Sequence, residues 1–132
     1  MCKQTHDQIM RYEDMVAVIR AAVETGIEQV RVTGGEPLVR AGIVDFISEL
    51  AAIPGLNDLT LTTNGSLLDR FAVPLKKAGL RRVNVSLDSL DPENFHKITR
   101  VGNLADVLRG IDAALEAGLN PLKINTVLMP GL

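Results

Sequence analysis

Apolar residues recur at helical spacing along several segments of the chain. In the segment 12–26 they occupy positions 15, 16, 19, 22 and 23, and Gly26 follows them. This spacing predicts an amphipathic helix that ends at a glycine. The same pattern predicts further helices near 43–53, 69–78 and 103–117, and a short helical turn near 92–99.

Four short segments between these helices alternate apolar and polar residues, which is typical of β-strands. A Gly-Ile or Gly-Leu pair precedes each of them, and the predicted strands lie near 29–33, 58–63, 82–87 and 122–128. Because strands and helices alternate, we expect parallel strands joined by right-handed crossovers, which is the α/β class.

The two faces of the predicted strands differ in polarity. We expect helices to pack on the apolar face, which carries Val30, Val32, Leu59, Leu61, Val83, Val85, Leu87, Ile124 and Leu128. The opposite face carries Arg31, Thr33, Thr60, Thr62, Asn64, Asn84, Ser86, Asp88, Lys123 and Asn125. A doubly wound sheet is apolar on both faces, so the alternation favours a partial (βα) TIM-like barrel with a polar lumen. We therefore expect one domain over 1–132 with about half the strands of a closed barrel.

The composition excludes several classes of protein. A formal net charge of -2 with interspersed signs offers no basic field for nucleic acid or for a membrane surface. The apolar runs are too short for a membrane span and the N-terminus lacks a signal pattern, so we expect a cytoplasmic protein. The single cysteine, Cys2, excludes an internal disulfide and a metal site built from several thiolates. We assign no catalytic residue and no metal ligand.

Polar groups collect where the predicted strands end. Thr33-Gly34-Gly35-Glu36-Pro37 follows the first strand, and the two glycines let a ligand approach the backbone, although Glu36 could equally be solvated. Ligands of parallel α/β folds bind at this end of the strands. Arg31 and Lys123 either form structural ion pairs with Glu36 or Asp88 or hold an anionic substrate.

Four motifs, in order, resemble the strand motifs of the radical S-adenosylmethionine (SAM) superfamily, and in particular the MoaA-type GTP 3',8-cyclases of molybdenum cofactor biosynthesis. They are RVTGGEPL (31–38), LTTNG (61–65), RVNVSLD (82–88) and KIN (123–125), and the resemblance runs from about Ile9 to the end. It implies that SAM contacts Gly34, Gly35, Glu36, Asn64 and Ser86. It implies that GTP contacts Arg31, Thr62, Lys123 and Asn125.

The resemblance also implies a chemistry that this chain lacks the groups to perform. In the family, a [4Fe–4S] cluster cleaves SAM reductively, and the resulting 5'-deoxyadenosyl radical abstracts hydrogen from GTP, which leads to 3',8-cyclo-7,8-dihydro-GTP. The C-x3-C-x2-C cluster motif of the family is not in this sequence, and Cys2 cannot replace three ligands. We therefore expect the isolated chain to be inactive, and we expect residues 1–8 to be an unrelated or truncated N-terminal segment.

Two other interpretations remain open. The chain could be a fragment of another radical SAM maturase, since the GGEP motif is shared among such enzymes. Alternatively it is a non-catalytic half-barrel that associates with itself, because the outer strands of an open sheet expose unpaired backbone groups.

Overall fold

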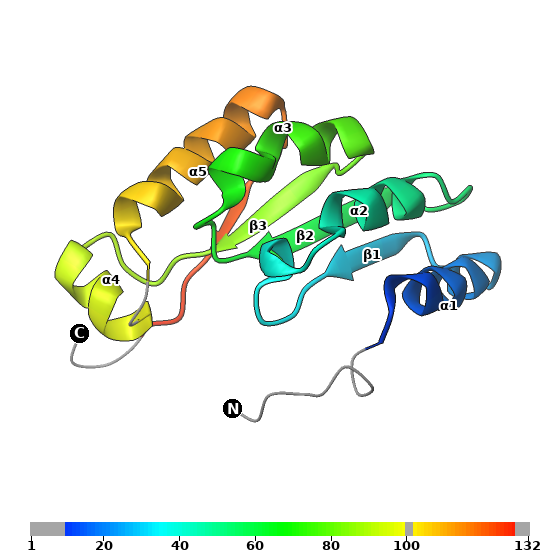
Figure 1. Cartoon of the computed structure of the whole chain (residues 1–132), viewed down its shortest axis with the longest axis horizontal. Helices are drawn as coiled ribbons and strands as arrows, with labels where there is room; N and C mark the ends of the chain where they lie inside the picture. Colours follow the sequence, from blue (N-terminus) through cyan, green and yellow to red (C-terminus); the bar gives the residue numbers. More distant parts are fainter. Residues whose placement is uncertain (1–9, 100–101, 129–132) are drawn as a thin grey trace.

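The computed structural model describes residues 10–99 and 102–128, which form one parallel sheet with helices on one side (Figure 1). Helices and strands alternate along the chain, as expected for the α/β class. The elements are α1 (Tyr12–Glu24), β1 (Gln29–Val32), the short 3-10 helix η2 (Pro37–Val39), α2 (Ile43–Ala51), β2 (Asp58–Thr63), α3 (Leu68–Ala78), β3 (Arg82–Ser86), α4 (Pro92–Thr99), α5 (Leu104–Ala117) and β4 (Lys123–Asn125).

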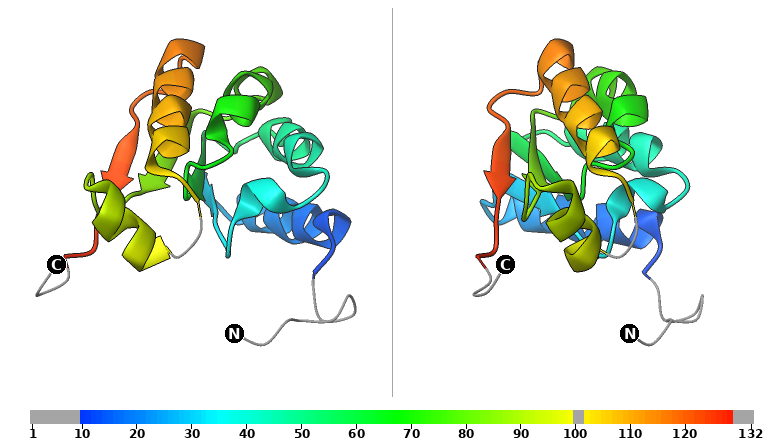
Figure 2. Two further views of the ribbon diagram at one scale, coloured as in Figure 1. Left: turned by 60° about the vertical axis from the view of Figure 1, so that its left-hand side comes forward. Right: turned by 90° about the vertical axis from the view of Figure 1, so that its left-hand side faces the viewer.

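The four strands lie side by side in the order β1-β2-β3-β4, and every neighbouring pair is parallel. Seen along the sheet in Figure 2, helices α2, α3 and α5 gather on one side and leave the other side bare. This arrangement confirms a partial α/β barrel and fits the single polar face that the alternation predicted. Among the described residues, no helix has the length and apolar run needed to cross a membrane.

The core lies between the apolar face of the sheet and the helices. Its strand residues come from the predicted apolar face, and the helices contribute apolar residues at three- and four-residue spacing. The central members, all buried, are Leu59, Leu61, Val83 and Val85 from the strands and Ile47, Leu50, Leu68, Leu75, Val107 and Ala114 from the helices. Burial of each large side chain contributes roughly 1.5 to 3 kcal/mol, so this layer accounts for much of the stability of the fold.

The prediction for the last strand is wrong in length. A strand was expected over 122–128, but β4 covers only Lys123–Asn125. Beyond it, side chains replace the backbone ladder: the Thr126 hydroxyl donates to the Leu87 carbonyl at 2.8 Å, and the Val127 amide donates to Asp88 Oδ1 at 2.9 Å. The segment 92–99, expected as a short helical turn, forms the eight-residue helix α4 with the same bounds.

The apolar side of β4 is also less covered than expected. Ile124 and Leu128 were predicted to pack under helices, yet their side chains are 50% and 89% exposed. The reason is position, because β4 is the edge strand of the described sheet and α5 packs mainly on α3. An alternating pattern determines which side of the sheet a residue faces, whereas the burial of its side chain depends on whether a helix covers that side.

Helix α1 packs on the rest of the fold through several apolar residues and through the only tyrosine of the chain. The Tyr12 ring meets Phe46 of α2 edge-on, with ring centroids 4.3 Å apart, and the Arg40 guanidinium lies 4.0 Å above the ring centroid. Arg40 also donates to the Met10 carbonyl at 2.7 Å. Burial raises the pKa of the Tyr12 hydroxyl, and the charge of Arg40 opposes this shift.

Candidate ligand-binding site on the bare face of the sheet

The register of the strands arranges the polar side chains of the bare face in rows. Thr62, Asn84 and Lys123 form one row across three strands. Ser86 and Asn125 form the next row toward the strand exits. Arg31, Thr60 and Arg82 form the row on the opposite side of Thr62, toward the strand starts. Most of the residues predicted to contact a ligand therefore share one surface near the carboxyl ends of the strands.

The two predicted cations stand on the outer strands of this surface. Arg31 on β1 and Lys123 on β4 are separated by three inter-strand spacings, about 14 Å, and lie one row apart. Both side chains are exposed. Within the part of the chain that the structure describes, neither forms an ion pair, so the expected alternative pairing with Glu36 or Asp88 is not observed. One cation on each outer strand, with neutral polar groups such as Thr62 and Asn84 on the strands between them, suits a long anionic ligand.

The loop after β1 is tied to the exit of β2 through the Glu36 carboxylate. The Thr63 hydroxyl lies 2.8 Å from both Glu36 oxygens and donates to the carboxylate, and the Asn64 amide donates to Glu36 Oε1 at 3.0 Å. Thr63 accepts in turn from the Gly65 amide at 3.1 Å. Glu36 is therefore a structural link between two loops in this arrangement. Its contact with SAM, which the resemblance implies, stays a prediction.

Thr63 was missed by the sequence analysis because it lies on the apolar side of β2. Its side chain is only 2% exposed, at a position where the alternation calls for an apolar residue. A polar residue at such a position needs a buried partner, and Glu36 provides it. The signal that could have found this contact is the break in the apolar pattern at residue 63.

The backbone of the glycine loop is open to a ligand. Apart from the neighbouring residues in the chain, a Cβ added at Gly34 or at Gly35 would meet no atom of the described residues within 4 Å, so space remains beside both glycines. Glu36, the residue after Gly35, fixes the loop through its hydrogen bonds to Thr63 and Asn64. These are the properties of a cradle for a small polar ligand, and the contact of SAM with Gly34 and Gly35 stays a prediction.

The loop after β2 is fixed by close packing against α5. A Cβ on Gly110 would lie 2.5 Å from the Gly65 carbonyl oxygen, and a Cβ on Gly65 would lie 3.0 Å from Val107. Both glycines are therefore required for this approach of helix and loop. Asn64 accepts from the amide and the hydroxyl of Ser66 at 2.9 and 2.7 Å, which leaves its side-chain amide group to donate elsewhere.

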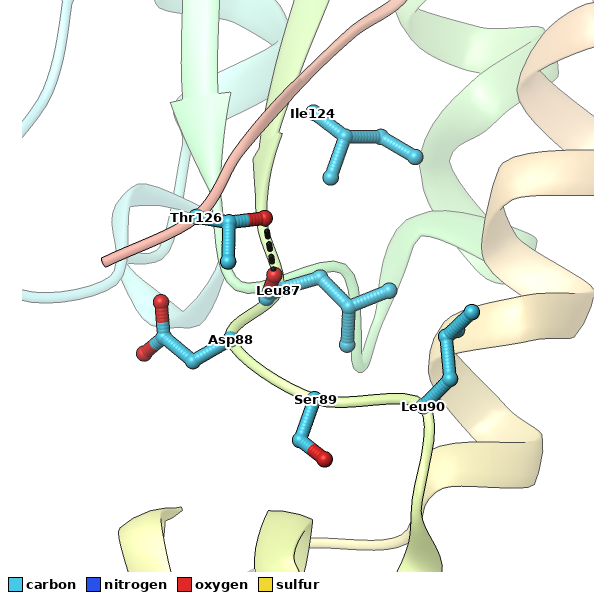
Figure 3. Close-up of a pocket in the computed structure, with 6 residues that line it drawn as sticks. All are labelled: Leu87, Asp88, Ser89, Leu90, Ile124 and Thr126. Carbon is cyan, nitrogen blue, oxygen red and sulfur yellow. Dashed lines mark hydrogen bonds between the residues drawn. The ribbon is translucent and has the colours of Figure 1, made fainter. Parts of the chain in front are cut away.

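The exit of β3 has polar groups on one side and an apolar pocket on the other. Figure 3 shows Leu87, Leu90 and Ile124 pointing toward the side of the helices and Asp88 pointing away from them. The Leu87 amide also donates to the Asn125 carbonyl at 3.0 Å. This hydrogen bond keeps Ser86 and Asn125, which are both predicted to contact a ligand, opposite each other on adjacent strands.

An ion pair that the sequence analysis did not anticipate lies at the base of the polar face. Arg82 on β3 pairs with Asp58 on β2, and both side chains are largely buried. The other carboxylate oxygen, Asp58 Oδ1, and the guanidinium atom Arg82 Nε are buried and without partners among the described residues. The base of the face is thus polar and incompletely hydrogen-bonded.

The residues of this chain do not fit an iron–sulfur cluster. The sequence holds one cysteine, whereas a [4Fe–4S] cluster is held by several thiolates. In the described part of the chain, no three His, Cys, Asp or Glu side chains gather as a metal site would require.

The fold and the site together define a partial parallel α/β barrel with an open polar face at its strand exits. The sequence profile of the radical SAM superfamily matches residues 3–132, and the chain belongs to that superfamily. Individual relatives narrow the similarity further. The chain is 55% identical over 129 residues to the GTP 3',8-cyclase of Petrotoga mobilis and 54% identical over 127 residues to that of Thermodesulfovibrio yellowstonii.

These alignments cover nearly the whole of this chain but a minor part of each relative. They include 98% and 96% of this chain and 40% and 39% of the two relatives. A GTP 3',8-cyclase from Geobacter sulfurreducens shows the same proportions, with 55% identity over 98% of this chain and 40% of the relative. The chain thus spans about 40% of the length of the curated relatives it matches.

The link between Thr63 and Glu36 predicts a measurable coupling. Replacing Thr63→Val keeps the shape but removes the hydroxyl, so we expect the free energy of unfolding in urea to fall by about 1 to 3 kcal/mol. Glu36→Ala removes the other partner, and the double variant should cost less than the sum of the single variants by at least ~0.5 kcal/mol. Strictly additive effects would show that the two side chains do not interact in the folded chain.

Proposed function

We propose that this chain is the central barrel segment of a cytoplasmic radical SAM GTP 3',8-cyclase, a lyase that acts in the first step of molybdenum cofactor biosynthesis. The full enzyme would convert GTP to 3',8-cyclo-7,8-dihydro-GTP. In this segment the polar face of the sheet would provide part of the GTP site, and the loops at the strand exits would provide part of the SAM site.

The observation that carries the proposal is the row Thr62–Asn84–Lys123, with Arg31 one row away. Both cations lack ion-pair partners in the described chain and stand on the outer strands, so each is free to hold an acceptor group of a nucleotide, such as a phosphate. The names of the relatives, all GTP 3',8-cyclases, support GTP over the substrate of another radical SAM maturase.

The SAM site would be built from the strand exits. Gly34 and Gly35 would admit the ligand to the backbone, while Glu36, Asn64 and Ser86 would surround it with polar groups. Asn125 would extend the GTP site beyond Lys123. When bound with a reduced cluster, SAM supplies radical chemistry, and the residues of this chain serve to orient SAM and GTP toward each other.

Titration with the two ligands tests the proposal. We expect the folded chain to bind GTP weakly, and Arg31→Ala and Lys123→Ala each to lower that affinity about tenfold, because a hydrogen bond to a charged group contributes about 1.5 to 3 kcal/mol. Ser86→Ala should lower the affinity for SAM and leave the affinity for GTP unchanged. Calorimetry measures both affinities.

The matched control is Lys77→Ala, which removes an exposed cation from α3 on the opposite side of the sheet. It should leave both affinities unchanged. If the folded wild-type chain binds neither ligand, the polar face is not a retained half-site and the proposal fails.

The isolated chain should have no cyclase activity, because it carries one cysteine. We expect anaerobic reconstitution to give iron and sulfide far below the stoichiometry of a [4Fe–4S] cluster, and to give no cleavage of SAM. Full incorporation of iron and sulfide with SAM cleavage would refute this part of the proposal.

A second candidate role is self-association through the strand edges. In the described sheet, β1 and β4 each have one neighbour, and Ile124, Val127 and Leu128 are exposed beside the β4 edge. A second copy offers a complementary parallel edge, so two half-barrels can pair β4 with β1.

Light scattering should then give twice the 14.3 kDa mass of one chain. Ile124→Lys should restore the single mass by placing a charge at the edge, while Leu115→Lys, on the exposed side of α5, should not. A single mass for the wild-type chain at every concentration would exclude this role.

A further inference from the structure

Asn84 is a buried asparagine at the centre of the polar face. It lies on β3 directly between Thr62 and Lys123, and its side chain is only 5% exposed. Within the part of the chain that the structure describes, its carboxamide makes no hydrogen bond. Its place on this face followed from the alternation of β3, but no ligand contact was assigned to it.

The buried polar side chains of the sheet differ in how they are paired. Three buried polar residues are found in the described chain: Thr60, Thr63 and Asn84. Thr63 is fully engaged by Glu36 and Gly65. Thr60 buries a single hydroxyl, whereas a carboxamide has two donor hydrogens and an acceptor oxygen. No described residue pairs with the Asn84 carboxamide, and its atoms are not among the fully enclosed ones, so they are available to a ligand on the polar face.

Other polar groups near Asn84 also lack hydrogen-bond partners among the described residues. Arg82, two residues earlier on the same face of β3, pairs with Asp58. Arg82 Nε and Asp58 Oδ1 are nevertheless buried and have no partner among the described residues. A polar floor with unused donors and acceptors therefore runs from the base of the sheet to the row of Lys123. A polar ligand can satisfy these groups, and water can do so in its absence.

We infer that Asn84 is a further binding residue for the nucleotide and that it recognises the nucleoside part rather than the phosphates. This inference rests on the proposed function. A neutral carboxamide matches the mixed donors and acceptors of a purine edge or of sugar hydroxyls, whereas cations suit phosphate oxygens. Neighbouring strands are about 4.8 Å apart, so one ligand can contact Thr62, Asn84 and Lys123 together.

The experiment compares GTP with guanosine, which lacks the phosphates, in ligand-observed NMR titrations of the full chain. Asn84→Ala should lower the affinity for GTP and for guanosine by a similar factor, about tenfold. Lys123→Ala should lower the affinity for GTP and leave guanosine nearly unchanged. Asn57→Ala, which alters an exposed asparagine before β2, should change neither affinity.

The unfolding temperature separates ligand contact from a structural role. Asn84→Ala removes a carboxamide that pairs with no described residue, so the unfolding temperature without ligand should stay nearly the same or rise. A clear fall would indicate a structural asparagine and overturn the inference. So would an Asn84→Ala variant that binds GTP like the wild type, or one that loses affinity for GTP but not for guanosine. If the wild-type chain binds no GTP at all, the proposed function fails and this inference with it.

Discussion

The whole molecule depends on the alternation of side chains along four parallel strands of which only one face is covered. The residues of one parity, such as Leu61 and Val85, are buried under the helices and stabilise the fold. The residues of the other parity, such as Thr62 and Lys123, form the polar face. A shift of one residue in the register would exchange the two faces, so the packing of the core also places the candidate site.

Carboxylates connect the strand exits in pairs along the rim of this face. Glu36 follows β1 and accepts from the backbone amide of Asn64 at the end of β2. Asp88 follows β3 and accepts from the backbone amide of Val127 after β4. In each case a side chain that follows one strand holds the exit of the next strand, which fixes the relative positions of the loops that would hold SAM.

Features that depend on a local pattern of residues were predictable from the sequence, whereas features that depend on three-dimensional surroundings were not. The parity of β1, β2 and β3 was predictable, because the period of two is visible in the residues themselves. The link between Thr63 and Glu36 was not, since the two residues are 27 positions apart and meet only when the loops meet. The exposure of Ile124 was also missed, because burial depends on a covering helix and not on the strand pattern.

The candidate site shows the same division. The positions of Arg31, Thr62, Ser86 and Lys123 on one face followed from the alternation, and the ligand contacts proposed for them come from the resemblance to GTP 3',8-cyclases. The burial of Asn84, by contrast, results from its neighbours on both adjacent strands and on its own strand. A sequence marks such a residue as polar, but it does not show that the residue lacks a partner.

The central claim is that nucleotide binds to the polar face of the sheet. Titrating isotope-labelled chain with GTP and following the backbone amides by two-dimensional NMR tests it most directly. We expect the shifted amides to cluster on the strand residues around Thr62, Asn84 and Lys123, with α1 and the outer side of α3 unaffected. Shifts gathered on the helical side, or a folded chain whose strand amides do not respond, would contradict it.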